Sequence, residues 1–134
     1  MTTILASRPE IPGEDFSRVA MTEQTMQLLQ KLRGMHGDLM FHLSGGCCDG
    51  SSPMCYPVGD FRTGGSDLLL GTFELPATDD LPATELGFWV AKPHFEYLRG
   101  SHITLDTVDG RGAGFSVESP EGKRFVMRST LLPS

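Results

Sequence analysis

The stretch TEQTMQLLQKLRGMHGDLMFHL, residues 22–43, changes from the spacing of a helix to the spacing of a strand. In its first half, four residues recur at the i, i+3, i+4, i+7 positions of a helix that buries one face: Thr25, Leu28, Leu29 and Leu32. Thr22 can cap this helix and Gly34 can end it. The second half predicts a strand over 38–43. Alternation there places Leu39, Phe41 and Leu43 on one face and Met40 and His42 on the other.

Outward from this stretch, further strands are expected around short apolar or alternating runs, at 66–74, 87–92 and 101–109. A short helix over 93–99 begins at Pro93 and ends before Gly100. The segments 114–119 and 123–129 are expected to form a hairpin around Ser119-Pro120-Glu121-Gly122, a common type I arrangement. The predicted fold class is mainly β with one or two helices, an α+β domain.

Length and composition are consistent with one such domain. The chain has 134 residues, 39% of them hydrophobic and 21% charged. A chain of this length buries roughly two thirds of its unfolded surface, so it can build a core without disulfide or metal staples. Residues 1–17 contain two prolines and a glycine among acids, and we expect them to form an extended N-terminal arm. Residues 18–134 are expected to form the domain.

Charge excludes several classes of function. Eleven Lys and Arg against seventeen Asp and Glu give a net charge of -6. This balance provides no electrostatic footprint for nucleic acid. No apolar run is long enough to span a bilayer, and the N-terminus lacks the basic start and apolar stretch of a secretory signal. We therefore expect a cytoplasmic protein with no nucleic-acid or membrane partner.

All three cysteines lie in one loop, SGGCCDGSSPMCYPVGDF, residues 44–61. Its glycines permit the sharp backbone turn that two adjacent cysteines need to reach one metal. Cys47, Cys48 and Cys55 are candidate metal ligands, and His42 at the start of the loop is a candidate fourth ligand. Asp49 and Asp60 are weaker candidates. Soft thiolates favour zinc, iron–sulfur clusters or copper(I).

Other interpretations of the loop stay open. Free cysteines are commonly small buried thiols in the core. Cys48 and Cys55 could exchange between thiol and disulfide, because a vicinal Cys47–Cys48 bridge is strained. A nucleophilic cysteine would need a pKa well below the free value, and no base is evident. No residue is assigned a catalytic role, and a non-metal interaction module with a rigid loop is the alternative function.

Two runs carry a family resemblance: His36 to Pro57, HGDLMFHLSGGCCDGSSPMCYP, and Asp106 to Glu118, DTVDGRGAGFSVE. They resemble the signature of the bacterial family catalogued as domain of unknown function 779, over about residues 18–130. Members of this family are often encoded beside aldehyde or alcohol dehydrogenases. The resemblance implies an accessory role with a dehydrogenase client.

A second, more distant resemblance is to the HesB-like A-type iron–sulfur carriers. It rests on Gly46-Cys47-Cys48-Asp49-Gly50 followed by the segments 95–100, 103–106 and 114–115 in the same order. The resemblance implies a compact β-rich fold, a metal or iron–sulfur cofactor and a homo-oligomer, most simply a dimer. The chain ends in LLPS and lacks the carriers' C-terminal Cys-Gly-Cys. Together, these observations predict a small metal- or cluster-binding accessory protein whose cofactor is zinc, iron or an iron–sulfur cluster.

Overall fold

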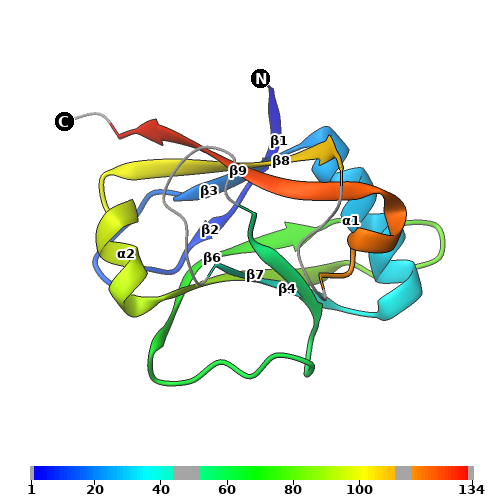
Figure 1. Ribbon diagram of the computed structural model, residues 1–134, viewed down its shortest axis with the longest axis horizontal. Coiled ribbons are helices and arrows are strands. Elements are labelled where there is room, and N and C mark those ends of the chain that lie inside the picture. The colour runs from blue at the N-terminus through cyan, green and yellow to red at the C-terminus, as the bar shows by residue number, and fades with distance from the viewer. Residues whose placement is uncertain (1, 44–51, 111–115, 133–134) are drawn as a thin grey trace.

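The computed structural model describes residues 2–43, 52–110 and 116–132. The chain forms two β-sheets and two α-helices, which confirms the predicted α+β class (Figure 1). The first sheet has the order β1 (Thr3–Ala6), β3 (Val19–Thr22), β8 (Ser101–Asp109), β9 (Lys123–Leu131). The second has the order β2 (Arg8–Pro9), β6 (Asp67–Leu75), β7 (Thr84–Ala91), β4 (Leu39–Leu43), β5 (Met54–Pro57).

The two sheets lie as layers, with α1 (Glu23–His36) and α2 (Lys92–Leu98) at opposite ends (Figure 1). Each helix carries the chain from one sheet to the other: α1 connects β3 to β4, and α2 connects β7 to β8. Within the sheets β3 is parallel to β8, and β4 is parallel to β7. Aromatic rings fill the space between the layers. Phe41 of β4 meets Phe125 of β9 edge-on, with ring centroids 5.1 Å apart.

Helix α1 begins where the sequence predicts but ends later. The Thr22 hydroxyl accepts a hydrogen bond of 3.4 Å from the Thr25 backbone N–H, as an N-cap does. The helix continues through Gly34 to His36 and is capped by Gly37, which has a positive φ of 84° and donates its N–H to the Arg33 carbonyl. The extra turn is anchored because buried Arg33 donates a 2.6 Å hydrogen bond to the Pro82 carbonyl.

The predicted hairpin between 114–119 and 123–129 is wrong. Strand β9 pairs with β8 along its whole length, from Asp109 opposite Lys123 to Ser101 opposite Leu131. The residues just before η1, a single 3₁₀ turn over Ser119–Glu121, run beside β5 instead, and the Val117 N–H donates to the Cys55 carbonyl at 3.0 Å. The turn signal depends only on neighbouring residues. It therefore predicted the bend at 119–122 but not the strand with which β9 pairs.

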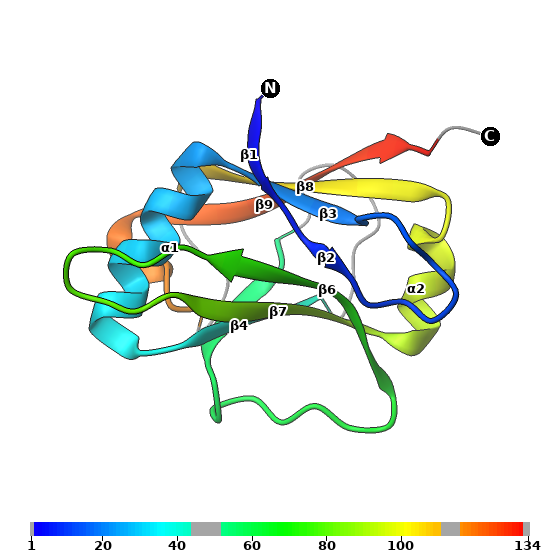
Figure 2. The same ribbon diagram turned by 180° about the vertical axis from the view of Figure 1, so that it is seen from behind.

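Two segments in which no strand was predicted, the loop after β4 and the extended N-terminal arm, contain strands. Within the predicted loop, β5 pairs antiparallel with β4 at the edge of the second sheet. The N-terminal segment 1–17 carries β1 and β2, and Figure 2 shows the chain crossing from the first sheet to the second between them. Across the described ranges, no helix is both long and apolar enough to cross a membrane.

Candidate functional site

The β4–β5 hairpin places the two ends of the cysteine loop. His42 lies near the end of β4, and Cys55 lies in β5. Cys47, Cys48 and Asp49 fall outside the described residues. The register pairs Phe41 with Cys55 and His42 with Met54. Because opposite residues of an antiparallel pair share a face and successive residues alternate, Cys55 and His42 project to opposite faces of the second sheet.

Cys55 is a core residue. Its side chain is 0% exposed and belongs to the hydrophobic cluster between the sheets. The backbone on both sides of it is held, because its N–H donates to Ser116 Oγ at 2.8 Å and its carbonyl accepts from Val117. Burial, and to a lesser degree the charge of Glu118, raise the pKa of the Cys55 thiol well above its ordinary value. The thiol is therefore protonated at neutral pH.

A buried carboxyl, Glu118, lies beside Cys55. Its side chain is 0% exposed, and its two oxygens accept hydrogen bonds from the Ser116 hydroxyl and from the Phe125 N–H at 3.3 Å. Burial raises the pKa of Glu118 above its usual range, although these hydrogen bonds act in the opposite direction. Glu118 and Ser116 thus tie the segment before η1 to both β5 and β9. The sequence marked them only as part of a family motif.

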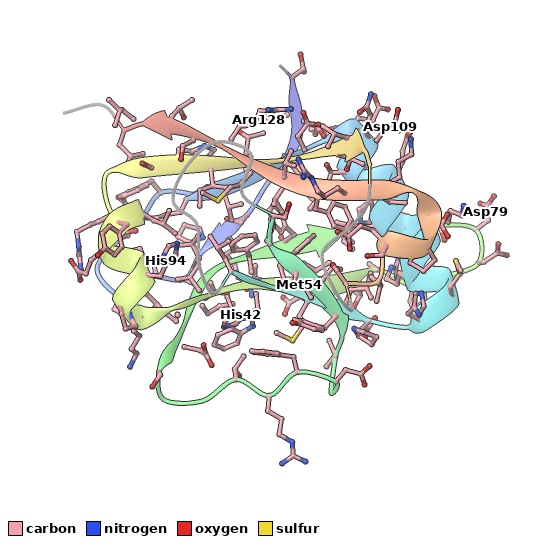
Figure 3. The ribbon with its side chains drawn as sticks, viewed as in Figure 1. His42, Met54, Asp79, His94, Asp109 and Arg128 are labelled. Carbon is pink, nitrogen blue, oxygen red and sulfur yellow. The ribbon has the colours of Figure 1, made fainter. Side chains whose placement is uncertain are left out.

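His42 occupies the other face, turned away from the first sheet (Figure 3). Its Nε2 lies 2.7 Å from Asp67 Oδ1, across β7 from β4. The second oxygen of Asp67 accepts the Gly64 N–H at 2.9 Å. Hydrogen bonds from His42 and Gly64 lower the pKa of Asp67, so its carboxylate is ionised and can only accept. His42 Nε2 therefore carries a hydrogen, and in the neutral ring the lone pair resides on Nδ1.

The ring of Phe61, from the chain after β5, lies against His42. The Phe61 ring centroid lies 4.4 Å from that of His42, and Phe61 in turn stacks on Tyr56 at 5.0 Å. His42 is consequently 5% exposed. A histidine that is buried, oriented by a carboxylate and covered by a ring is held in one rotamer and one tautomer. Neither Asp67 nor Phe61 was a candidate from the sequence, since each becomes a neighbour of His42 only through strand order and loop path.

The predicted ligands are therefore only partly placed. His42 and Cys55 are not brought together, and Asp60 lies exposed on the turn after β5. Among residues 2–43, 52–110 and 116–132, no group of three or more His, Cys, Asp or Glu side chains is arranged to hold a metal ion. The set Cys47, Cys48, Cys55 and His42 stays a prediction, because two of its members fall in the loop that is not described.

The fold and the site together define an α+β domain of two mixed sheets with an oriented, buried histidine at the base of a cysteine loop. The family described as "Domain of unknown function (DUF779)" matches residues 28–131, and the chain belongs to this family. No curated protein and no solved structure matches the chain. The HesB-like resemblance stays a prediction.

Proposed function

We propose that this protein is a small metal-binding accessory protein that holds a zinc or iron ion, or an iron–sulfur cluster, through Cys47, Cys48 and His42. The observation that carries the proposal is the 2.7 Å contact between His42 Nε2 and the ionised Asp67. Metal-ligating histidines almost always donate their second ring N–H to a carboxylate, carbonyl or water, which fixes the tautomer and raises the basicity of the ligating nitrogen. Here that nitrogen is Nδ1.

Cys55 is omitted from the proposed ligand set for two reasons. A thiol must lose its proton to bind a metal, and burial raises the pKa of Cys55. The side chain also projects into the core, on the face opposite to His42. Two thiolates and one imidazole leave a tetrahedral site one ligand short. A second copy of the chain in a homodimer could supply that ligand, and so could the client dehydrogenase that the family resemblance implies.

The test is metal analysis with visible absorption spectra after anaerobic purification. We expect bound zinc or iron, lost in Cys47→Ser and Cys48→Ser. Asp67→Asn should weaken metal affinity by about 10- to 100-fold, because His42 loses its carboxylate partner. The matched control is Asp79→Asn, which removes an exposed acid on the β6–β7 connection. A protein without bound metal, whose spectra and stability ignore the two cysteine changes, would overturn the proposal.

A second candidate function is a non-metal interaction module. The buried, protonated Cys55 thiol favours this function. Strand β5 is also held on both sides, because it pairs with β4 on one side and its Cys55 backbone is hydrogen-bonded to Ser116 and Val117 on the other. The two candidates differ in their response to a chelator. If an aldehyde or alcohol dehydrogenase co-purifies with this protein in excess chelator, the module is supported. If chelation abolishes that association, the metal-binding function is supported.

A further inference from the structure

A cleft of about 920 Å³ lies on the other side of β5 from β4, between the turn after β5 and the start of η1. Its described lining includes Tyr56, Pro57, Asp60, Ser119 and Pro120, with His36 from the end of α1. This volume falls in the range of ligand pockets, roughly 300–1,000 Å³. Of the proposed metal ligands, His42 does not line the cleft, and the function proposed above makes no use of the cleft.

The walls of the cleft are held by backbone hydrogen bonds. The turn after β5 closes with the Asp60 N–H donating to the Pro57 carbonyl at 3.0 Å. The opposite wall is fixed to β5 by Val117, whose N–H donates to the Cys55 carbonyl, and η1 is closed by the Ser119 N–H on the Ser116 carbonyl at 3.2 Å. A ligand would therefore enter a site that is already formed, which lowers the entropic cost of binding.

The polar groups of the cleft favour a cation that donates hydrogen bonds. Asp60 contributes an exposed carboxylate. The Ser119 hydroxyl has no hydrogen-bond partner among the described residues, but it is buried out of reach of a molecule in the cleft, so Asp60 is the polar group available to a ligand. Neither Lys nor Arg is among the described lining residues. The Asp60 carboxylate attracts positive charge and repels anions.

The apolar groups of the cleft favour a ligand with a flat body. Tyr56 is fixed in orientation by its stacking on Phe61, with an interplanar angle of 19°. Pro57 and Pro120 add rigid apolar surface on either side of the opening. The face of a tyrosine ring attracts cations electrostatically, and planar ligand rings pack on aromatic and proline surfaces.

We propose that this cleft binds a small organic cation, a primary ammonium group attached to an aromatic ring. The ammonium group pairs with the Asp60 carboxylate, and the ring packs on Tyr56. The site is a specificity site for amines: it selects the charged amine over a neutral or anionic molecule of the same shape.

The test uses three probes of matched shape: benzylamine, benzyl alcohol and benzoate, each titrated into the ¹⁵N-labelled full chain at neutral pH and followed by amide chemical shifts. We expect benzylamine to shift the amides of Tyr56, Asp60 and Ser119 at the lowest concentration, benzyl alcohol to bind more weakly, and benzoate not to bind. Asp60→Asn should weaken benzylamine binding by about three- to tenfold and leave benzyl alcohol unchanged, since one charge-assisted contact is lost.

Asp79→Asn again serves as the control, because it removes the same charge from the β6–β7 connection, and Asp79 does not line the cleft. Both variants change exposed residues, so their spectra should otherwise match that of the unchanged chain. Three results would overturn the proposal: benzoate binding as tightly as benzylamine, no binding of any probe, or unchanged benzylamine affinity in Asp60→Asn. None of these results bears on the metal-binding function, which is measured by metal content.

Discussion

Replacing Cys55 by Ser tests whether this residue is part of the core or a ligand. The substitution changes a buried thiol into a hydroxyl of similar size inside the apolar cluster, next to Phe41 in the register. The nearby acceptors, the two oxygens of Glu118, already receive hydrogen bonds from Ser116 and Phe125. A hydroxyl buried without a full partner costs about 1–3 kcal/mol in protein mutational data. We expect Cys55→Ser to reduce the free energy of unfolding by this amount.

Urea denaturation followed by circular dichroism measures the effect. With an m value of about 1–3 kcal/mol/M, the expected loss shifts the midpoint by about 1 M at unchanged slope. The control is Cys55→Val, an apolar residue of similar volume, which should cost less than about 1.5 kcal/mol and leave the metal content unchanged. The reasoning is refuted if Ser is tolerated as well as the native Cys, or if Val removes bound metal without loss of stability.

Three further predictions concern buried residues that stabilise the fold. In Glu118→Gln the free energy of unfolding should fall less with rising pH than in the native chain. Because the pKa of Glu118 is raised in the folded state, its protonated carboxyl stabilises the fold below about pH 4.5, and this stabilisation is lost as pH rises through the folded-state pKa. Equal pH profiles for the variant and the native chain, measured by urea titrations in parallel, would contradict this. Arg18→Met should reduce the free energy of unfolding by about 3–5 kcal/mol in thermal unfolding. The buried guanidinium donates a 2.7 Å hydrogen bond to Glu14 and also donates to the backbone carbonyls at the end of α2. A loss below about 1 kcal/mol, the value of an exposed ion pair, would refute this prediction. Gly71→Ala should lower the melting temperature by several degrees, about 4 °C or more, because its Cβ would lie 2.7 Å from Ser7 Cβ; an unchanged melting curve would show that β2 can move aside.

Local patterns predicted most of the regular elements. The cap at Thr22, the spacing of the α1 residues and the alternation in 101–109 each involve neighbours within a few residues, so the sequence alone reveals them. Strand β5 was missed because Met54–Pro57 is short and lies in a segment rich in Gly, Ser and Pro. Its extended form depends on pairing with β4.

The site was predicted less well than the fold. His42 was a candidate because of its place beside the cysteine loop, and the structure adds two neighbours that the sequence did not reveal, Asp67 and Phe61. Cys55 was grouped with the other cysteines by closeness in sequence. The register of one strand instead separates it from His42 and turns it into the core.

The sequence by itself determined the fold class, the main helix and the clustering of all three cysteines between Cys47 and Cys55, because these follow from local spacing and composition. The tertiary structure decided which side chains meet. Strand β9 pairs with β8, and Asp67 contacts His42 across β7. Glu118 accepts a hydrogen bond from Ser116 beside Cys55. The physical reason is that strand order and register are set by burial of whole faces between two sheets. A shift of one residue would exchange the core face for the outer face.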